Sequence, residues 1–402
     1  MAPPAAPVCD ASTTKLRHAK HDRAGSVQHT KASMKDERRA AALRKAQQDL
    51  GSKYRIGRVL GEGGYGIVFS ARERGTEKRV AIKRIAPFEH PLLTVRTLRE
   101  LRILRHFGVQ KDCDIVIALR DVVISGELDT FQDIYLVQER MDCDLHHVIR
   151  AGEVTSDHAQ YLIYQLLVGL KFIHSAGVIH RDIKPSNLLV NTQCDLRICD
   201  FGLARSIDGG LQAAQEGFLT EYVATRWYRA PEIMLSSKLY TQAVDIWSVG
   251  CTLYEMLMGR TLFPGKDYHH QLGLILDVLG TPGMETLRPI CSSRALDYVH
   301  QLPRRDSKPW ESLLPNVSKE ARDFIARTVT IDPTKRMTAA ECLAHPYLKV
   351  YHDEFKMEEV ECPRLDRQMF YFDFEPKDTA CGRQKHREEL WRDAQQFSRP
   401  GI

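Results

Sequence analysis

The chain lacks both a long apolar run and paired cysteines. A membrane-spanning helix needs about 20 consecutive apolar residues, and the 402-residue sequence contains no run of that kind. The opening MAPPAAPVCD has no charged stretch followed by an apolar one, so it is unlike a secretion signal. The ten cysteines include no Cys-x-x-Cys pair, which argues against a structural zinc site. We therefore expect reduced cysteines and a location in the cytoplasm and nucleus, away from membranes.

Excess charge is also missing from most of the chain. Residues 1–50 hold ten Lys and Arg against five Asp and Glu, which accounts for the whole net charge of +5. We therefore expect no direct binding to nucleic acid by the remainder. The same 50 residues have almost no apolar β-branched or aromatic side chains, so we expect a basic extension without fixed structure. Only Met34 to Leu50 favours a helix, although it lacks a broad apolar face.

The residue pattern changes at Tyr54 and again near Gly152. YRIGRVLGEGGYGIVFSAR, RVAIKRI, IVIALRDVVIS and DIYLVQER are typical of antiparallel strands. LLTVRTLRELRILRHF interrupts them with apolar residues at helical spacing. Beyond Gly152 the spacing is mainly helical, as in HAQYLIYQLLVGLKFIHSAG and DIWSVGCTLYEMLMGR. A small sheet with one helix, followed by a larger helical part, predicts an α+β architecture.

A glycine-rich segment lies in the first predicted strand region. Gly61 to Val68 reads GEGGYGIV and matches G-x-G-x-x-G-x-V, in which glycines let the main chain approach phosphates. A dinucleotide-binding loop would lead into a helix, whereas Ile67 to Phe69 continue as a strand. The later Val80-Ala-Ile-Lys83 favours a loop over the phosphates of ATP.

Three further motifs supply charged groups for phosphoryl transfer. Asp182 in IHRDIKPSN can meet a substrate hydroxyl, while Asn187 of the same motif can reach a magnesium ion. Asp200 in DFG offers a second oxygen ligand, which hard Mg²⁺ prefers. Glu100 on the predicted helix can orient Lys83 onto the ATP phosphates. The reaction mainly needs positioning and charge neutralisation, so we expect ATP and Mg²⁺ as cofactors.

Taken in this order, the motifs resemble those of the protein kinase superfamily from about Tyr54 to Leu348. The resemblance implies a bilobal fold in which Glu232 of the APE motif pairs with Arg336 and Asp245 braces the catalytic loop. The implied divisions are an N-lobe at about 54–139, a hinge at about 139–142, a C-lobe at about 143–348 with a MAP kinase insert at about 266–313, and a C-terminal extension at 349–402.

Thr220-Glu221-Tyr222, followed by VATRWYRAPE, resembles the activation lip of MAP kinases of the extracellular-signal-regulated type. Cyclin-dependent kinases share WYRAPE but lack the Thr-x-Tyr pair. The resemblance implies proline-directed Ser/Thr substrates and activation by an upstream dual-specificity kinase that phosphorylates Thr220 and Tyr222. Stretches such as RMDCDLHHVIRAG further resemble the fungal cell-wall-integrity branch. Arginines expected to bind the lip phosphates are Arg99, Arg181, Arg205, Arg226 and Arg229.

The resemblance also assigns the remaining site residues. Lys184 and Thr225 are expected to assist Asp182 in catalysis. Gly64 stands where relatives carry Ala or Ser, which should loosen the phosphate loop. Residues expected to bind ATP are Gly61, Glu62, Gly63, Gly64, Tyr65, Gly66, Val68, Ala81, Lys83, Gln138 (the gatekeeper), Glu139 and Met141.

An acidic docking patch for basic partner peptides, including those of phosphatases, is expected to begin at Asp353 and Glu354. Lys356 and Met357 stand where acidic residues would be expected, so we expect weakened or altered docking.

Two other functions remain open at this point. A pseudokinase or scaffold would lack one of Lys83, Asp182, Asn187 or Asp200, and all four are present. A cyclin-dependent-type kinase would copurify with a cyclin.

Overall fold

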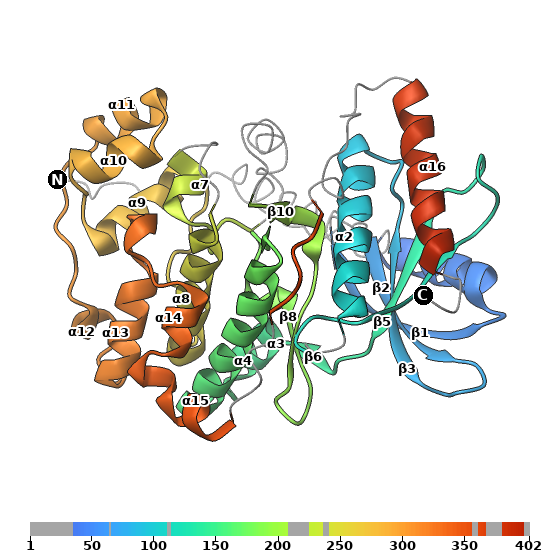
Figure 1. Ribbon diagram of the computed structural model, residues 1–402, viewed down its shortest axis with the longest axis horizontal. Coiled ribbons are helices and arrows are strands. Elements are labelled where there is room, and N and C mark those ends of the chain that lie inside the picture. The colour runs from blue at the N-terminus through green and yellow to red at the C-terminus, as the bar shows by residue number, and fades with distance from the viewer. Residues whose placement is uncertain are drawn as a thin grey trace, which may run out of the picture.

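The computed structural model describes residues 35–63, 66–110, 114–207, 225–235, 241–355, 361–366 and 380–397. Two lobes are evident in Figure 1: strands β1 to β5 with helix α2 form one, and a larger helix-rich part forms the other. This arrangement confirms the α+β, bilobal prediction. No helix in the described ranges has the length and apolar character needed to cross a membrane.

The smaller lobe contains a five-stranded sheet in which every neighbouring pair is antiparallel. Its order is β1-β2-β3-β5-β4. Successive side chains of a strand point to opposite faces, so Ala81 and Lys83 lie on one face of β3 while Val80 and Ile82 lie on the other. The strands are β1 (Tyr54–Gly63), β2 (Gly66–Glu73), β3 (Arg79–Ile85), β4 (Leu119–Ile124) and β5 (Ile134–Glu139).

Strand β4 is shorter than the sequence predicts, because Ile115 to Ile117 pair elsewhere. The main-chain N–H of Ile198 donates to Ile115 O at 2.7 Å, and the N–H of Ile117 donates to Ile198 O at 3.0 Å. This segment therefore joins the small lobe to strand β9 (Leu196–Ile198) of the large lobe. The predicted strand over 115–125 is wrong for its first residues.

Helix α2 (Pro91–Val109) provides the expected helix of the small lobe. His90 caps its N-terminus by accepting a hydrogen bond from the N–H of Leu92, and Pro91 occupies the first helical turn, where a missing N–H costs little. Its buried face includes Leu98, Leu101 and Leu104. Packing of this face determines the direction in which Glu100 points.

A helix formed by residues 35–50 precedes the sheet. Ala42, Ala46 and Leu50 recur at intervals of four residues on one side of it, and all three are buried. They pack with Phe69 and Ile82 on the sheet face that carries Val80. The helix expected between Met34 and Leu50 is therefore present, and the expectation of no fixed structure is wrong for residues 35–50.

The larger lobe is organised around two apolar helices, α4 (Ser156–Ser175) and α8 (Ala243–Met258). Both bury most of their residues, since neighbouring elements cover them on several sides.

Two small antiparallel sheets, β7–β10 and β6–β8–β9, lie beside these two helices. The strands are β6 (Cys143–Asp144), β7 (Val178–Ile179), β8 (Leu188–Val190), β9 (Leu196–Ile198) and β10 (Arg205–Ser206). The other helices are α3 (Leu145–Ala151), η1 (Pro185–Asn187), η2 (Phe201–Leu203), α7 (Pro231–Leu235), α9 (Tyr268–Leu279), α10 (Met284–Ile290), α11 (Ser293–Gln301), α12 (Trp310–Leu313), α13 (Lys319–Thr328), η3 (Pro333–Lys335), α14 (Ala339–Leu343), η4 (Pro346–Leu348) and α15 (Lys349–Phe355).

The chain returns to the small lobe through its last described helix, α16 (Ala380–Phe397). Figure 1 shows α16 alongside α2. Arg102 of α2 pairs with Asp393 at 2.5 Å and also with Glu389. The rings of Trp391 and Phe131 lie 5.8 Å apart. The C-terminal extension therefore packs on the helix that carries Glu100, which the sequence did not predict.

Candidate active site

A cleft of about 560 Å³ is lined by residues of both lobes. Val68 and Ala81 contribute from the sheet, Met141 from the segment joining the lobes, and Leu189 from below. Gln138 also lines it and is 8% exposed, and its amide nitrogen has no hydrogen-bond partner among the described residues. A buried, unpartnered donor is costly, so this group fits a bound ligand with an acceptor, such as the adenine ring of ATP.

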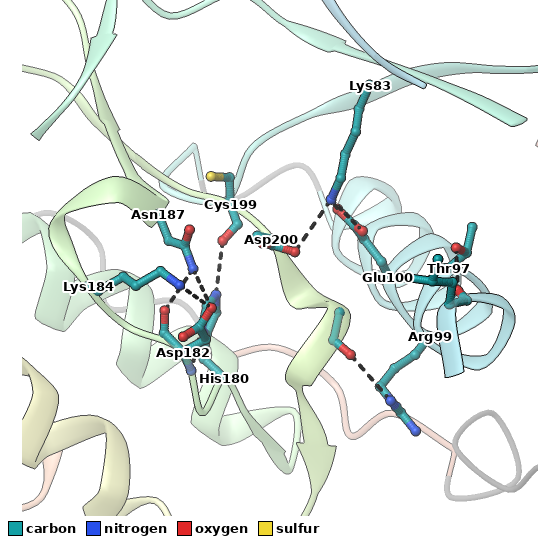
Figure 2. A network of polar contacts seen from close by, with 12 residues as sticks. Lys83, Thr97, Arg99, Glu100, His180, Asp182, Lys184, Asn187, Cys199 and Asp200 are labelled. Carbon is teal, nitrogen blue, oxygen red and sulfur yellow. Dashed lines mark hydrogen bonds and ion pairs between the residues drawn. The ribbon is translucent and has the colours of Figure 1, made fainter. Parts of the chain in front are cut away.

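Lys83, Glu100 and Asp200 meet at the inner end of this cleft (Figure 2). The Nζ atom of Lys83 lies 2.8 Å from both carboxylate oxygens of Glu100 and 3.4 Å from Oδ1 of Asp200. Burial lowers the pKa of Lys83, but the two carboxylates outweigh burial and raise it above its ordinary value. Burial also opposes ionisation of Asp200, yet Lys83 and Lys184 hold its pKa below the ordinary value. Lys83 and Asp200 are therefore both charged at neutral pH.

The catalytic loop brings Asp182, Lys184 and Asn187 together. Lys184 Nζ donates to Oδ2 of Asp182 at 2.8 Å, and Nδ2 of Asn187 donates to the same oxygen at 2.9 Å. The amide of Asn187 also donates to the main-chain oxygen of Asp182 at 2.8 Å. These contacts hold the Asp182 carboxylate in one orientation.

The main chain is held in an uncommon conformation at two places in the site. Arg181 and Asp200 have φ angles of 67° and 66°, a left-handed region that non-glycine residues rarely adopt. Asp245 of α8 accepts hydrogen bonds from the N–H groups of His180 (2.9 Å) and Arg181 (2.8 Å). Its carboxylate thereby stabilises the strained loop from beneath, as predicted.

Burial of Asp245 is complete and by itself would raise its pKa. Hydrogen bonds from His174 Nε2, at 2.9 Å, and from the Arg181 N–H outweigh that effect and hold the pKa below its ordinary value. Asp245 of α8 is therefore ionised where it accepts the hydrogen bonds from the catalytic loop. The ring of His180 also lies 4.8 Å from that of Phe201, which connects the loop to the Asp200 segment.

The residues present fit a magnesium ion that is shared with phosphates. Asn187 turns its amide nitrogen toward Asp182, and Figure 2 shows its oxygen on the opposite side. Asp200 supplies carboxylate oxygens. In the described ranges no group of three or more His, Cys, Asp or Glu could enclose a metal. Two hard oxygen donors suit Mg²⁺, which usually retains waters and phosphate oxygens.

An ion pair closes the segment beyond the activation lip. Arg336 forms two bonds to Glu232, at 2.6 and 2.7 Å, as predicted. The arginine also lies over the Trp247 ring, with its guanidinium carbon 5.0 Å from the ring centre. This pair joins α7 (Pro231–Leu235) to the segment that follows α13 (Lys319–Thr328).

Comparison with known proteins agrees with this geometry. Residues 54–348 match the family described as protein kinase domain. The mitogen-activated protein kinase PMK11 of Pyricularia oryzae is 50% identical over 334 residues, covering 83% of this chain and 92% of the relative.

The chain belongs to the mitogen-activated protein kinases. The kinase is also similar to mpkB of Aspergillus fumigatus, a mitogen-activated protein kinase 49% identical over 82% of this chain and 91% of the relative. The mitogen-activated protein kinase spk1 of Schizosaccharomyces pombe is 48% identical over 76% and 80%. These matches do not favour a pseudokinase or a cyclin-dependent-type kinase. The relatives' names identify no branch, so the cell-wall-integrity assignment stays a prediction.

The kinase places its predicted ATP-binding residues on two sides of the sheet. Lining the cleft are Gly61, Val68, Ala81, Lys83, Gln138, Glu139 and Met141. Lining a separate groove against the 35–50 helix are Glu62, Gly63 and Gly66. The side chain of Glu62 is therefore directed away from the cleft. Outside the described residues lie Gly64, Tyr65, Thr220, Tyr222, Lys356, Met357 and the side chain of Glu354.

One arginine of the site was missed by sequence reasoning. Arg96 of α2 is buried. It lies close to Gly202, since a Cβ atom added at Gly202 would be 3.8 Å from the Cβ atom of Arg96. It precedes Arg99 by three residues, so both lie on the same face of the helix. The three-residue spacing between Arg96 and Arg99 was the sequence signal that could have identified Arg96. The predicted Thr225 is exposed at the start of the segment after the lip.

Proposed function

We propose that this kinase transfers the γ-phosphoryl group of Mg-ATP to Ser or Thr followed by Pro, after phosphorylation of Thr220 and Tyr222. The observation that carries the proposal is the convergence of Lys83, Glu100 and Asp200 on one cleft. That arrangement holds the Lys83 ammonium group at the inner end of the cleft, where it could bind a phosphate oxygen, with the Asp200 carboxylate beside it. The MAP kinase relatives support the substrate class and the double phosphorylation as properties of the family.

Each charged residue of the site has a separate task. Asp182 accepts the proton of the substrate hydroxyl, in an orientation held by Lys184 and Asn187. Lys83 binds phosphate oxygens, and Glu100 keeps its ammonium group in place. Asn187 and Asp200 would hold the magnesium ion, which neutralises phosphate charge when bound.

Arginines around the lip support regulation by phosphate. The carbonyl oxygen of Leu203 accepts hydrogen bonds from Arg181 at 3.4 Å and from Arg205 at 3.3 Å. Arg99 of α2 donates to the neighbouring Gly202 O at 3.3 Å. Three guanidinium groups from three elements thus gather at one turn. A phosphate on Thr220 would supply the charge and acceptor oxygens to bind them.

Binding of one phosphate by this group would also affect the cleft. Arg99 is the residue next to Glu100 on α2, so a contact from the lip to Arg99 positions Glu100 against Lys83. Phosphate on Tyr222 would engage Arg226 and Arg229, which lie just beyond it in the chain. We infer that this second phosphate shapes the pocket for the proline that follows the target residue.

Partners are expected to include an upstream dual-specificity kinase, protein substrates, and phosphatases that carry basic docking peptides. Asp353 is exposed on α15, where it could contribute to such docking. The cysteines whose side chains the structure describes form no disulfide bonds, which supports a reducing compartment such as the cytoplasm or nucleus.

The proposal is tested by comparing two preparations of the kinase with a matched pair of peptides. One preparation is unphosphorylated and the other is phosphorylated on both Thr220 and Tyr222, as verified by mass spectrometry. The peptides differ only in having Pro or Ala after the target Ser. We expect much faster turnover for the doubly phosphorylated form, and for that form a strong preference for the Pro peptide.

Two control variants separate phosphate from simple negative charge. Thr220→Ala with Tyr222→Phe should stay at the low rate after treatment with the upstream kinase. Thr220→Glu with Tyr222→Glu should recover little activity, because a carboxylate brings one charge and two oxygens. Equal rates for the unphosphorylated and doubly phosphorylated proteins would refute the switch.

A further inference from the structure

The helix of residues 35–50 covers the sheet face opposite the cleft. Ile67 and Phe69 of β2 point to this face, and they are 7% and 0% exposed because Ala42, Ala46 and Leu50 pack over them. Val68, between them, faces the cleft. The covering helix and the bound nucleotide therefore lie on opposite sides of the same strands.

Polar contacts anchor the C-terminal half of the helix to β5. Asp49 accepts a hydrogen bond from the hydroxyl of Tyr135 at 2.6 Å. Lys45 lies 3.3 Å from both Asp49 and Asp133. Strand β5 lies between β3 and β4 in the sheet and is almost completely buried. This end of the helix thus rests on a strand that is buried and paired with a neighbouring strand on each side.

The N-terminal half reaches the glycine-rich loop. Nε of Arg39 lies 3.1 Å from Oε2 of Glu62, with side chains 38% and 17% exposed. Glu62 is the cross-strand partner of Ile67, and paired residues share a face of the sheet. The register therefore places the Glu62 side chain on the face that the helix covers. Arg39 and Asp49 are separated by roughly 15 Å along the helix axis.

A groove lies beside the described residues of the loop on this side of the sheet. A Cβ atom at Gly63, which lines this groove, would have no described atom within 4 Å. The groove, of about 340 Å³, separates the loop from the helix and from the start of α2. Glu62 lines this groove, and Arg39 contacts its carboxylate directly at 3.1 Å. This contact also pairs the Glu62 carboxylate with a positive charge, one residue away from Gly61, which lines the cleft.

We propose that the 35–50 helix positions the glycine-rich loop, with Arg39 as the residue that holds Glu62 and so raises nucleotide affinity. The inference rests on the proposed function only in that the cleft binds a nucleotide. Arg39 is a positioning residue, because it lies on the far side of the sheet. Its loss should leave the charged groups around Lys83 unchanged and weaken nucleotide binding.

The test is titration of the full-length, unphosphorylated kinase with MgADP. Arg39→Glu should raise the dissociation constant about two- to fivefold, as expected for a partly exposed ion pair. Arg39→Lys should stay near wild type. Arg44→Glu is the charge-matched control, since Arg44 is exposed on the same helix. The charge-exchanged double variant, Arg39→Glu with Glu62→Arg, should recover most of the lost affinity.

Kinetics of the doubly phosphorylated kinase provide a second measurement. Arg39→Glu should raise KM for ATP by the same factor and leave kcat within about twofold, because loop position affects binding more than chemistry. Circular dichroism and thermal unfolding should show that the helix persists.

Several outcomes would overturn the inference. One is equal MgADP affinity for wild type, Arg39→Glu and Arg44→Glu; another is failure of the double variant to recover affinity. A fall in kcat together with lower thermal stability would indicate a purely structural role. If the wild type itself does not bind MgADP, the proposed function fails as well, so the two failures are distinguishable.

Discussion

The guanidinium of Arg336 and the carboxylate of Glu232 form a two-bond ion pair in which both side chains are almost completely buried, at 0% and 1% exposed. Arg336 also donates to the main-chain oxygens of Thr330 and Ala243. A buried charge whose partner is removed is strongly destabilising, whereas replacing the whole pair by apolar residues can be neutral. The pair therefore offers a sharp test of what holds the large lobe together.

We expect Arg336→Met to lower the free energy of unfolding by about 3–5 kcal/mol, since it leaves the Glu232 carboxylate buried without its partner. Adding Glu232→Met should restore part of that loss. Urea unfolding of the two single variants and the double variant gives the coupling energy. Additive effects of the single changes would contradict the importance of the pair.

Lys83→Met and Asp200→Asn should each cut turnover by at least roughly a hundredfold, because each removes a charge that acts on phosphates or metal. Folding should survive, as judged by thermal unfolding. Lys78→Met is a suitable control, since Lys78 is exposed on the turn before β3. Near-wild-type turnover of purified Lys83→Met, free of contaminating kinases, would refute the assigned role.

Asp245→Asn should destabilise the fold, because an amide cannot accept all the hydrogen bonds from His174, His180 and Arg181. The folded-state pKa of Asp245 lies below its ordinary value of 3.8. Its stabilising effect is therefore complete above pH of about 5 and is lost as pH falls through the lower folded pKa. The difference in unfolding free energy between wild type and variant should shrink as pH falls below about 5. A difference independent of pH would mean that the ionised carboxylate is not what stabilises the loop.

Lys356→Asp should tighten binding of basic docking peptides, because the wild-type lysine repels them. Fluorescence titration with a labelled basic peptide measures the change at low and high salt. Lys308→Asp, at an exposed position of the insert, controls for a general change in net charge. If affinity stays constant or falls, this part of the chain is not the docking patch.

The sequence alone was sufficient for the groups whose positions follow from local chain geometry. Asp182 and Asn187 lie within one short loop, so their spacing implied that both could act at one site, and the structure shows both in contact, together with Lys184. The expected contribution of Ala81 to the ATP site came from the family resemblance, and Ala81 lines the cleft. The contact of Lys83 with Glu100 could be predicted only with the kinase template, because the two residues lie on different elements, β3 and α2.

Other features depended on tertiary packing, which no local pattern specifies. Strand β3 has apolar side chains on both faces, so something had to cover Val80 and Ile82. The sequence did not say that it would be the 35–50 helix, whose narrow stripe of small residues gave a weak signal. Arg39 and Glu62 meet only because that helix packs across β2, and α16 reaches Arg102 of α2 from almost three hundred residues away. The local spacing of the motif residues thus determined the chemistry of the site. Burial of apolar surface in the folded chain decided which helices cover the sheet and α2, and therefore which contacts these helices make with the loop and with α2.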